Sequence, residues 1–390
     1  MIKIEDKKDC CGCTSCVQAC SQKCISFTED REGFCYPKVN HKQCTKCGLC
    51  EKVCPIIQNK NKSIQQPTKV YAAKNKNEEI RRHSSSGGIF TLLAEETIKQ
   101  GGVVFGARFD EKWDVLHDYT ETIDGLASFR GSKYVQSRIG DNYQKARTFL
   151  KEGRKILFSG TPCQIAGLKS FLRKEYENLL CVDFVCHGIP SPKVWHYYLK
   201  SYTKKKEHIE KINFRDKTHG WKNYCFVISL STKTSVEEMD AVSQSKIFKK
   251  DPFMNVFLQN VSIRPSCYDC RFRSLKSGAD ITIGDFWGIE RINHTFDDDK
   301  GVSLVIINTE KGKESFNINE AIIEEHSFQE ACRYNNSLIA SSEPHPLRSF
   351  FFYFLPLCNN VEFLSKKCLG YKHNILYRVY KKIHSLLIIK

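Results

Sequence analysis

The 390-residue sequence lacks any long hydrophobic run. No stretch approaches the roughly 20 apolar residues that a membrane-spanning helix requires. The first ten residues, MIKIEDKKDC, also lack the apolar core of a secretory signal. We therefore expect a cytoplasmic protein without a transmembrane segment, in a compartment where thiols stay reduced.

Two kinds of motif are also missing. The chain has no G-x-G-x-x-G dinucleotide fingerprint, so direct use of NAD is not supported. It has no helix-turn-helix or zinc-finger spacing, and its basic residues are scattered, so we do not expect a nucleic-acid partner.

Acidic residues are fewer than basic ones, 44 against 60, which leaves a formal net charge of +16. A solvated basic surface explains such an excess without any function. The excess also suits an anionic cofactor, an acidic partner protein or an anionic organic substrate.

Cysteine, in contrast, is abundant, with 20 residues in a chain that is otherwise ordinary for a soluble globular protein. In a reducing compartment this number favours metal or redox chemistry over disulfides. The length allows two or three domains.

The character of the sequence changes along the chain. A cysteine-rich start with few apolar segments is followed by a polar, turn-rich linker, and then by short β-like runs that alternate with helical stretches. This alternation predicts a mixed α/β domain. The end is amphipathic and basic, which indicates a helical tail capping the core, with contact to a membrane surface or a partner as the alternative. The predicted divisions are 1–57, 58–69, 70–350 (N-terminal part 70–150, C-terminal part 151–350) and 351–390.

Two cysteine runs share one spacing. Residues 10–20 and 44–54 both follow C-x2-C-x2-C-x3-C, and Pro55 follows the second run. This spacing is typical of bacterial ferredoxins with two 4Fe-4S clusters, in which the fourth cysteine of each run binds the other cluster. Three thiolates in one loop reach three irons, whereas the fourth lies on a following helical turn and points away, to the other cluster. We therefore assign Cys10, Cys13, Cys16 and Cys54 to one cluster, and Cys44, Cys47, Cys50 and Cys20 to the second.

Zinc is the alternative metal, but zinc sites usually show C-x2-C pairs without a third cysteine two residues further on. Ser21 replaces the proline that usually follows such a run, which alters the turn and not the ligands. Both Cys10 and its neighbour Cys11 are candidate ligands, and the regular spacing favours Cys10. Cys24 and Cys35 have no partner in this scheme and are interpreted as small buried apolar residues.

Three segments of the larger domain carry chemical groups. HSSSGG (83–88) precedes an apolar helical stretch, where hydroxyls and glycine backbone form a phosphate site, although a serine-rich helix N-cap explains the same pattern. FRGSKYVQS (129–137) combines basic, hydroxyl and amide groups. SGTPCQIAG (159–167) follows the strand KILF and begins a helix, where α/β sheets present ligands.

These segments are followed in order by DFVCHGIPSP (183–192), PSCYDCRFR (265–273) and DITIGDFWG (280–288). With them the chain resembles the coenzyme F-420 (deazaflavin) hydrogenase/dehydrogenase beta subunits over nearly its whole length. Ferredoxin runs in front of this domain are a common fusion in the family. The family name does not fix the substrate, because relatives reduce compounds other than deazaflavin.

The resemblance implies an FAD-binding α/β domain. Lys133 is chemically suited to such a site because a cation near the ring stabilises the anionic reduced flavin. His187 is either a proton donor near the flavin or a structural turn residue. The implied flavin-binding residues are Ser85, Ser86, Gly87, Gly88, Lys133, Tyr134, Gln136, Thr161, Pro162 and Gln164, with Lys133 and His187 as the candidate catalytic pair.

The resemblance also implies a third 4Fe-4S cluster beside the flavin. Its ligands would be Cys163 and Cys186, each at the end of a strand, together with the C-x2-C pair Cys267 and Cys270. Two buried core residues and half of a zinc knuckle are the alternative. Two further cysteines, at 181 and 225, lie within strand-like runs and are not expected to bind iron.

The combined prediction is an iron–sulfur flavoprotein oxidoreductase. FAD would exchange a hydride or electron pair with an organic substrate, and the clusters would pass single electrons to or from a redox partner protein, such as a ferredoxin or a dehydrogenase or hydrogenase subunit. Two alternatives remain: an electron-transfer subunit of a larger hydrogenase or dehydrogenase, and a catalytically inert accessory protein of surface-polysaccharide biosynthesis.

Overall fold

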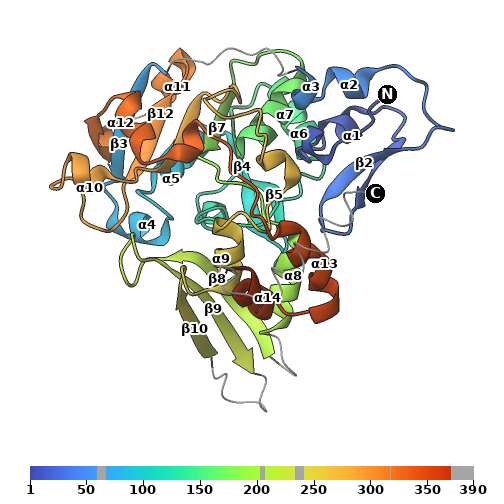
Figure 1. The fold of residues 1–390 in the computed structure, drawn as a ribbon. Coiled ribbons are helices and arrows are strands. Elements are labelled where there is room, and N and C mark those ends of the chain that lie inside the picture. The colour runs from blue at the N-terminus through green and yellow to red at the C-terminus, as the bar shows by residue number, and fades with distance from the viewer. Residues whose placement is uncertain (59–66, 203–206, 233–240, 317, 370–390) are drawn as a thin grey trace.

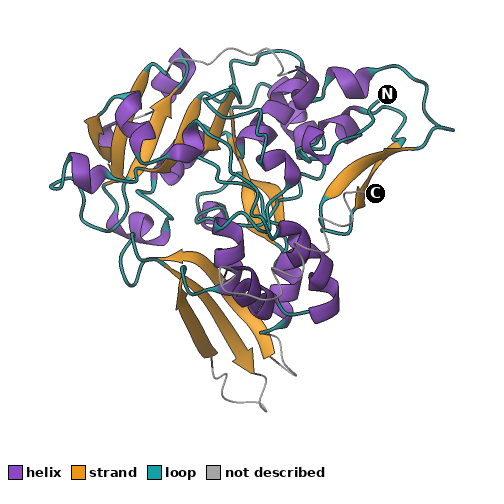
Figure 2. Cartoon of the chain, in the orientation of Figure 1, coloured by secondary structure: helices purple, strands orange, loops and turns teal. Residues whose placement is uncertain are grey.

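The computed structural model describes residues 1–58, 67–202, 207–232, 241–316 and 318–369. They form a mixed α/β fold, which confirms the predicted fold class. Figures 1 and 2 show a central sheet with helices around it, a smaller sheet below it and the N-terminal segment on one side. None of the described helices is both long and apolar enough to cross a membrane.

The central sheet has eight strands in the order β13-β3-β12-β11-β7-β6-β4-β5. Its middle strands β11, β7, β6 and β4 run parallel, whereas the remaining neighbours pair antiparallel. The strand bounds are β3 Lys69–Asn75, β4 Val103–Phe109, β5 Val115–Thr120, β6 Ile156–Gly160, β7 Leu179–Phe184, β11 Ile281–Asp285, β12 Ser303–Ile307 and β13 Ala321–Glu325.

Both faces of the parallel strands are buried, as their near-continuous apolar runs require. On β4, Val104 faces the core formed with α5 (Ile89–Lys99), whereas Val103 and Phe105 face the core formed with α6 (Asn142–Lys151) and α7 (Pro162–Leu172). This alternation follows from the two-residue period of a strand. Because β6 and β7 are parallel neighbours in the sheet, their carboxyl ends lie side by side.

A second antiparallel sheet, of order β10-β9-β8, packs with four helices around buried aromatic residues such as Trp195, Phe214 and Phe253. Its elements are β8 Glu207–Asp216, β9 Cys225–Thr232, β10 Ala241–Ile247, α8 Pro192–Lys200, α9 Pro252–Leu258, α13 Arg348–Cys358 and α14 Val361–Leu369. The peripheral helices are α4 Glu78–His83, α10 Ile289–Ile292, α11 Glu310–Ser315 and α12 Phe328–Arg333, and the described short 3-10 turns are Lys7–Asp9, Asp124–Ser128, Pro265–Cys267, Ile318–Glu320 and Asn336–Leu338.

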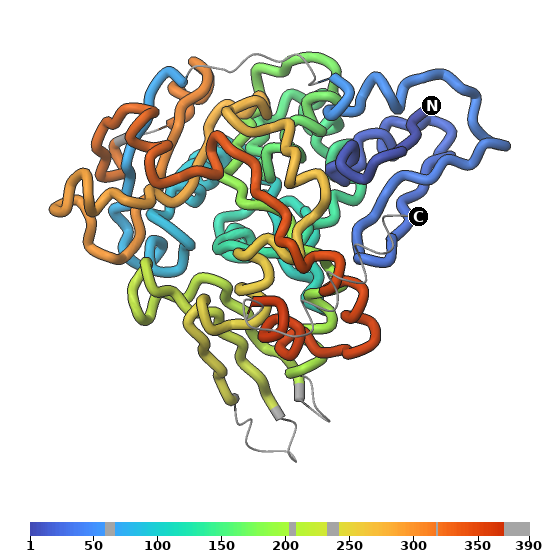
Figure 3. Tube along the Cα trace, viewed as in Figure 1, coloured from blue at the N-terminus to red at the C-terminus, as the bar shows by residue number. Residues whose placement is uncertain are grey.

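The cysteine-rich N-terminal segment packs against the helical face of the central sheet (Figure 3). Ser15 donates a hydrogen bond to the carbonyl of Gly167 on α7, with 2.8 Å between oxygens. A side chain at Gly167 would meet Cys13, because an added Cβ would lie 2.8 Å from the cysteine Cβ. The elements of this segment are α1 Ser15–Ala19, β1 Ile25–Glu29, β2 Cys35–Val39, α2 Leu49–Lys52 and α3 Pro55–Gln58.

Two predicted segments fall mostly outside the described residues. In the predicted linker 58–69, α3 ends at Gln58 and β3 begins at Lys69, and residues 59–66 are not described. In the predicted tail 351–390, helices extend to Leu369, and residues 370–390 are not described.

Candidate functional site

The two cysteine runs fold into loops of the same backbone shape. Gly12 and Thr14 have φ angles of 75° and 65°, and the residues at the same places in the second run, Lys46 and Gly48, have φ angles of 56° and 76°. Left-handed backbone is uncommon outside glycine, so its recurrence at both places marks one loop conformation. A short helix follows each loop, α1 and α2. In this alignment Cys10 corresponds to Cys44.

The outer site is our name for Cys20, Cys44, Cys47 and Cys50. All four line one cavity of about 20 Å³, so the structure brings Cys20 together with three cysteines of the second run. Cys47 is exposed, whereas Cys50 is buried. Cys24, expected as a buried apolar residue, is buried and also lines this cavity, with its sulfur 3.4 Å from that of Cys20.

The inner site is our name for Cys10, Cys13, Cys16 and Cys54. These four thiols influence one another: burial raises the pKa of Cys16, and the sulfurs of the other three raise it further. Cys10 also lies 3.6 Å from the guanidinium nitrogen of the fully buried Arg264.

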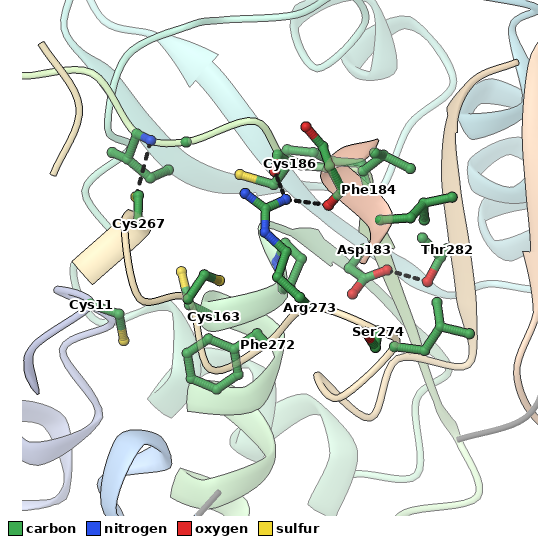
Figure 4. Close-up of a pocket in the computed structure, with 18 of the residues that line it drawn as sticks. Cys11, Cys163, Asp183, Phe184, Cys186, Cys267, Phe272, Arg273, Ser274 and Thr282 are labelled. Atoms are coloured by element: carbon green, nitrogen blue, oxygen red, sulfur yellow. Dashed lines mark hydrogen bonds between the residues drawn. The ribbon is translucent and has the colours of Figure 1, made fainter. Parts of the chain in front are cut away.

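The core site is our name for Cys163, Cys186, Cys267 and Cys270. β6 and β7 are parallel neighbours, and Gly160 pairs with Asp183. Cys163 and Cys186 each follow three residues after that pair, so both stand beyond the same edge of the sheet. All four cysteines line one cavity of about 50 Å³, drawn in Figure 4. Burial raises the pKa of Cys267 to about 12 and also raises those of Cys186 and Cys270.

Arg273 lines the core-site cavity and indicates what charge the site suits (Figure 4). Its guanidinium donates to the carbonyls of Cys186 and His187, the latter at 3.0 Å. Its Nε is buried and has no hydrogen-bond partner among the described residues. A half-buried cation with a buried, unused donor fits an anionic group, such as an iron–sulfur cluster held by thiolates.

Cys11 lies between the inner and core sites. It lines the core-site cavity, and it packs with Cys13 of the inner site and Cys163 of the core site. A hydrogen bond from Cys11 is the main reason that the pKa of Cys13 falls to about 7 and that of Cys163 is lowered. By its place Cys11 joins the two sites, and Cys10, which aligns with Cys44, stays the predicted iron ligand.

No three Cys, His, Asp or Glu side chains in the described part of the chain converge as ligands of a single metal ion. Four thiolates around four irons stand further apart than four around one ion. The three sites are therefore matched to clusters by the cavities that their cysteines share, by the conformation of the loops and by the nearby positive charge.

The three segments expected to bind flavin contact one another in series. Ser85 accepts a hydrogen bond from the Ser132 backbone N–H at 2.6 Å, which joins HSSSGG to FRGSKYVQS. Gln164 donates to the Ser137 hydroxyl at 2.8 Å, which joins FRGSKYVQS to SGTPCQIAG. Figure 4 includes the last of these segments, from which Pro162 and Cys163 reach the core-site cavity.

The fold itself requires several of the residues in HSSSGG and SGTPCQIAG. An added Cβ at Gly87 would lie 2.3 Å from the carbonyl oxygen of Ala73, and Gly88 has a φ of 85° where α5 begins. Ser86 donates to the Val302 carbonyl at 2.8 Å. Thr161 and Gln164 form a capping box at the start of α7.

Lys133 does not extend into solvent. Its amine donates to the carbonyls of Phe129, Arg130 and Gly131 at 3.3, 3.1 and 3.2 Å. Burial lowers the pKa of this amine to about 7.

The other polar residues expected near the flavin are also engaged. The hydroxyl of Tyr134 accepts from Arg215 at 3.2 Å, and Gln136 accepts from Arg264 at the same distance. His187 has a pKa lowered by burial, and its Nε2 makes no hydrogen bond within the described residues. Two cysteines are not expected to bind iron, Cys181 in β7 and Cys225 in β9. Both are buried within their strands, each 1% exposed.

Comparison with known proteins gives the class and the family. The family description "coenzyme F420 hydrogenase/dehydrogenase, beta subunit" matches at residues 70–141 for its N-terminal part and 153–331 for its C-terminal part. The coenzyme F420-dependent sulfite reductase of Methanocaldococcus jannaschii is 24% identical over 325 residues, 80% of this chain. The chain spans 46% of that relative's length.

A solved structure is also similar. A chain of the F420-reducing [NiFe] hydrogenase complex from Methanosarcina barkeri aligns with a TM-score of 0.45 and 15% identity, covering 78% of this chain and 90% of that one. The family matches place the α/β part of the chain in a class of proteins described as hydrogenase and dehydrogenase subunits. The chain belongs to the coenzyme F420 hydrogenase/dehydrogenase beta subunit family, as the ordered segments predicted.

Sequence reasoning missed the residues that join the sites. Arg264 and Arg273 belong to no spacing pattern, because their partners are distant in sequence. The same holds for the contact of Cys11 with both the inner and the core site. The one available signal was the density of arginines around the pair Cys267 and Cys270.

Proposed function

We propose that this protein is an iron–sulfur flavoprotein that couples two-electron chemistry on an organic substrate to single-electron exchange with a redox protein. Bound FAD would supply the coupling, because flavin is stable with one or two added electrons. The relatives' names support an anionic organic substrate of the deazaflavin kind as the first compound to test.

The observation that carries this proposal is the grouping of twelve cysteines into three sets that adjoin one another. Cys11 contacts a member of the inner site and a member of the core site, and the inner and outer sites exchange their fourth ligands through Cys20 and Cys54. The three sets thus follow one another from the exposed Cys47 to the sheet edge beside the flavin segments. Such a series suits stepwise electron passage.

The chain's own residues would prepare the flavin site in defined ways. The carbonyls of residues 129–131 hold the Lys133 amine in place, and the Ser85–Ser132 contact fixes the loop that carries it. With a pKa of about 7, this amine is charged below pH 7 and neutral above it. A charged amine favours an anionic reduced flavin, so reduction should be easier on the acidic side of pH 7.

The test is anaerobic purification followed by counts of iron, sulfide and FAD. We expect about twelve irons, about twelve sulfides and one FAD per chain. Iron without FAD would contradict the flavoprotein proposal and favour an electron-transfer subunit, which a stable partner in a pull-down would support. Absence of both would favour the inert accessory protein.

Lys133→Met tests the flavin residues separately. We expect the pH dependence of flavin reduction near pH 7 to disappear, while Lys133→Arg keeps the charge without a transition there. An unchanged pH profile in Lys133→Met would remove Lys133 from the site.

A further inference from the structure

Arg264 is a fully buried cation between the inner site, the core site and the segments expected to bind flavin. Its Nε donates to the Cys10 carbonyl at 2.8 Å, and its two terminal nitrogens donate to the Cys35 carbonyl at 2.9 Å and the Gln136 side chain at 3.2 Å. It is 0% exposed. It precedes Pro265 at the start of RPSCYDCRFR, the segment that carries Cys267 and Cys270, and the sequence assigned it no role of its own.

The guanidinium forms no ion pair with any carboxylate of the described residues. Its flat faces lie over aromatic rings instead, with Tyr36 at 4.5 Å and Phe34 at 5.4 Å from the guanidinium carbon. Burying an unpaired charge costs several kcal/mol, even after relaxation. The nearby groups that can become anionic are Cys10, the phenol of Tyr36, Cys11 and Cys267, and the sulfur of Cys10 lies 3.6 Å from a guanidinium nitrogen. The anion that compensates Arg264 is therefore to be sought in the inner site.

A second, half-buried arginine shows the usual solution. Arg348 forms a bidentate pair with Glu32 at 2.8 and 2.6 Å and stacks on Phe352. Both arginines lie against aromatic rings, but Arg348 is paired with a carboxylate, whereas Arg264 has the sulfur of Cys10 beside it. The contrast indicates that the negative charge that balances the Arg264 guanidinium comes from an iron–sulfur cluster.

Arg264 also connects the inner site to the core site. Its carbonyl accepts the Cys267 backbone N–H at 2.9 Å, so the side chain touches one set while the backbone holds a member of the other. Among the described residues, no buried arginine lines the cavity of the outer site: the cations there are the N-terminal amine, which is paired with Glu51 at 2.5 Å, and the solvent-exposed Lys46.

We propose that Arg264 is a positioning residue that acts as the counter-cation of the inner cluster and makes it easier to reduce than the outer one. This inference rests on the proposed function. Reduction adds one electron to a cluster, and a fixed buried cation stabilises the added charge, which raises the reduction potential. An electron given to the outer site by an external reductant then passes inward to the inner site, leaving the outer cluster oxidised.

The test is a redox titration of the iron-loaded full chain, followed by electron paramagnetic resonance, in the parent, Arg264→Lys and Arg264→Met proteins. We expect Arg264→Met to shift the inner-site midpoint to a more negative potential and to leave the outer-site midpoint unchanged. Because lysine keeps the positive charge, the inner-site midpoint of Arg264→Lys should lie close to that of the parent protein. Arg348→Met is the matched control, and it should leave both midpoints in place.

A second measurement covers the case in which Arg264→Met folds poorly. Thermal unfolding is compared for parent and variant with iron bound and after chelation, and the loss of melting temperature should be larger with iron bound. Equal losses in the two states, or an unmoved inner-site midpoint, would overturn the proposal. Failure of the proposed function is separate, because it would appear as missing iron or sulfide in the parent protein.

Discussion

The inner and outer sites share a loop conformation and differ in almost everything around it. Both loops carry left-handed residues at the same two places, and both lead into a short helix. The inner loop is pressed against α7 and Arg264, whereas the outer loop faces solvent at Cys47. The cysteine spacing determines the loop, and the neighbours determine how the loop is used.

This difference suggests a division of labour. A buried site between two others suits passage of electrons within the chain, whereas an exposed site suits exchange with a separate protein. Each of the following predictions tests that contrast.

Removing one ligand from each site should have the largest effect. Cys16→Ser and Cys47→Ser should each lose about four irons of roughly twelve. Because the outer site has little apolar core beyond its cysteines, Cys47→Ser should loosen the N-terminal segment and leave the α/β part folded. Cys16→Ser should also weaken docking of α1 on α7 and lower the melting temperature of the whole chain.

Iron counts and calorimetry measure both effects, and Cys332→Ser, on α12, is a control that should lose no iron. Identical unfolding of the Cys16 and Cys47 variants would abolish the distinction between inner and outer sites.

Removing the core site should affect the inner site more than the outer one. A Cys267→Ser, Cys270→Ser double variant should lose about four irons and block electron flow between flavin and the N-terminal clusters. Its remaining paramagnetic signals should change for the inner site, since Cys11 contacts both sets, and stay constant for the outer site. Retention of the full iron count would refute the core site.

The loop glycines give a smaller, local comparison. Gly48→Ala should cost about 1 kcal/mol, because it adds only left-handed strain and a Cβ there meets nothing within 4 Å. Gly12→Ala adds the same strain and places a Cβ 2.6 Å from the Gln136 amide and 3.0 Å from Arg264. We expect about 1–3 kcal/mol more destabilisation. Denaturant unfolding of the iron-loaded proteins measures both values, and equal costs would mean that the inner loop is not closely packed.

Much of the fold could be predicted because its signals are local. The strand–helix order of the α/β part follows from apolar runs, and Cys163 and Cys186 could be brought together because both follow parallel strands. The ferredoxin spacing also leads one to expect that the four cysteines of the outer site line one cavity, as they do.

The rest depends on contacts between distant segments. Arg264 meets Cys10 across 254 residues, and nothing in either segment marks the pairing. Lys133 looked like a residue free to approach a flavin, but its amine is held by its own loop. Such outcomes depend on backbone path and burial, which spacing does not encode.

The smallest expected effect concerns the surface of the outer site. Five exposed lysines lie on the segments that form its cavity, and none of them pairs with a carboxylate of the described residues. The nearby Glu51 is taken up by the N-terminal amine at 2.5 Å. This arrangement suits an acidic redox partner. The lysines are Lys23, Lys38, Lys42, Lys46 and Lys52.

Replacing Lys42, Lys46 and Lys52 with glutamate should slow electron exchange with an acidic two-cluster ferredoxin about tenfold at low salt, because steering of the encounter is lost. The difference should shrink as salt rises, since the screening length falls to about 10 Å at 0.1 M. The matched control reverses three exposed lysines elsewhere and makes the same change in net charge, at Lys99, Lys112 and Lys250. Stopped-flow rates across a salt series measure both variants. Equal slowing in the two would show that net charge alone steers the partner and that the outer site is not its docking surface.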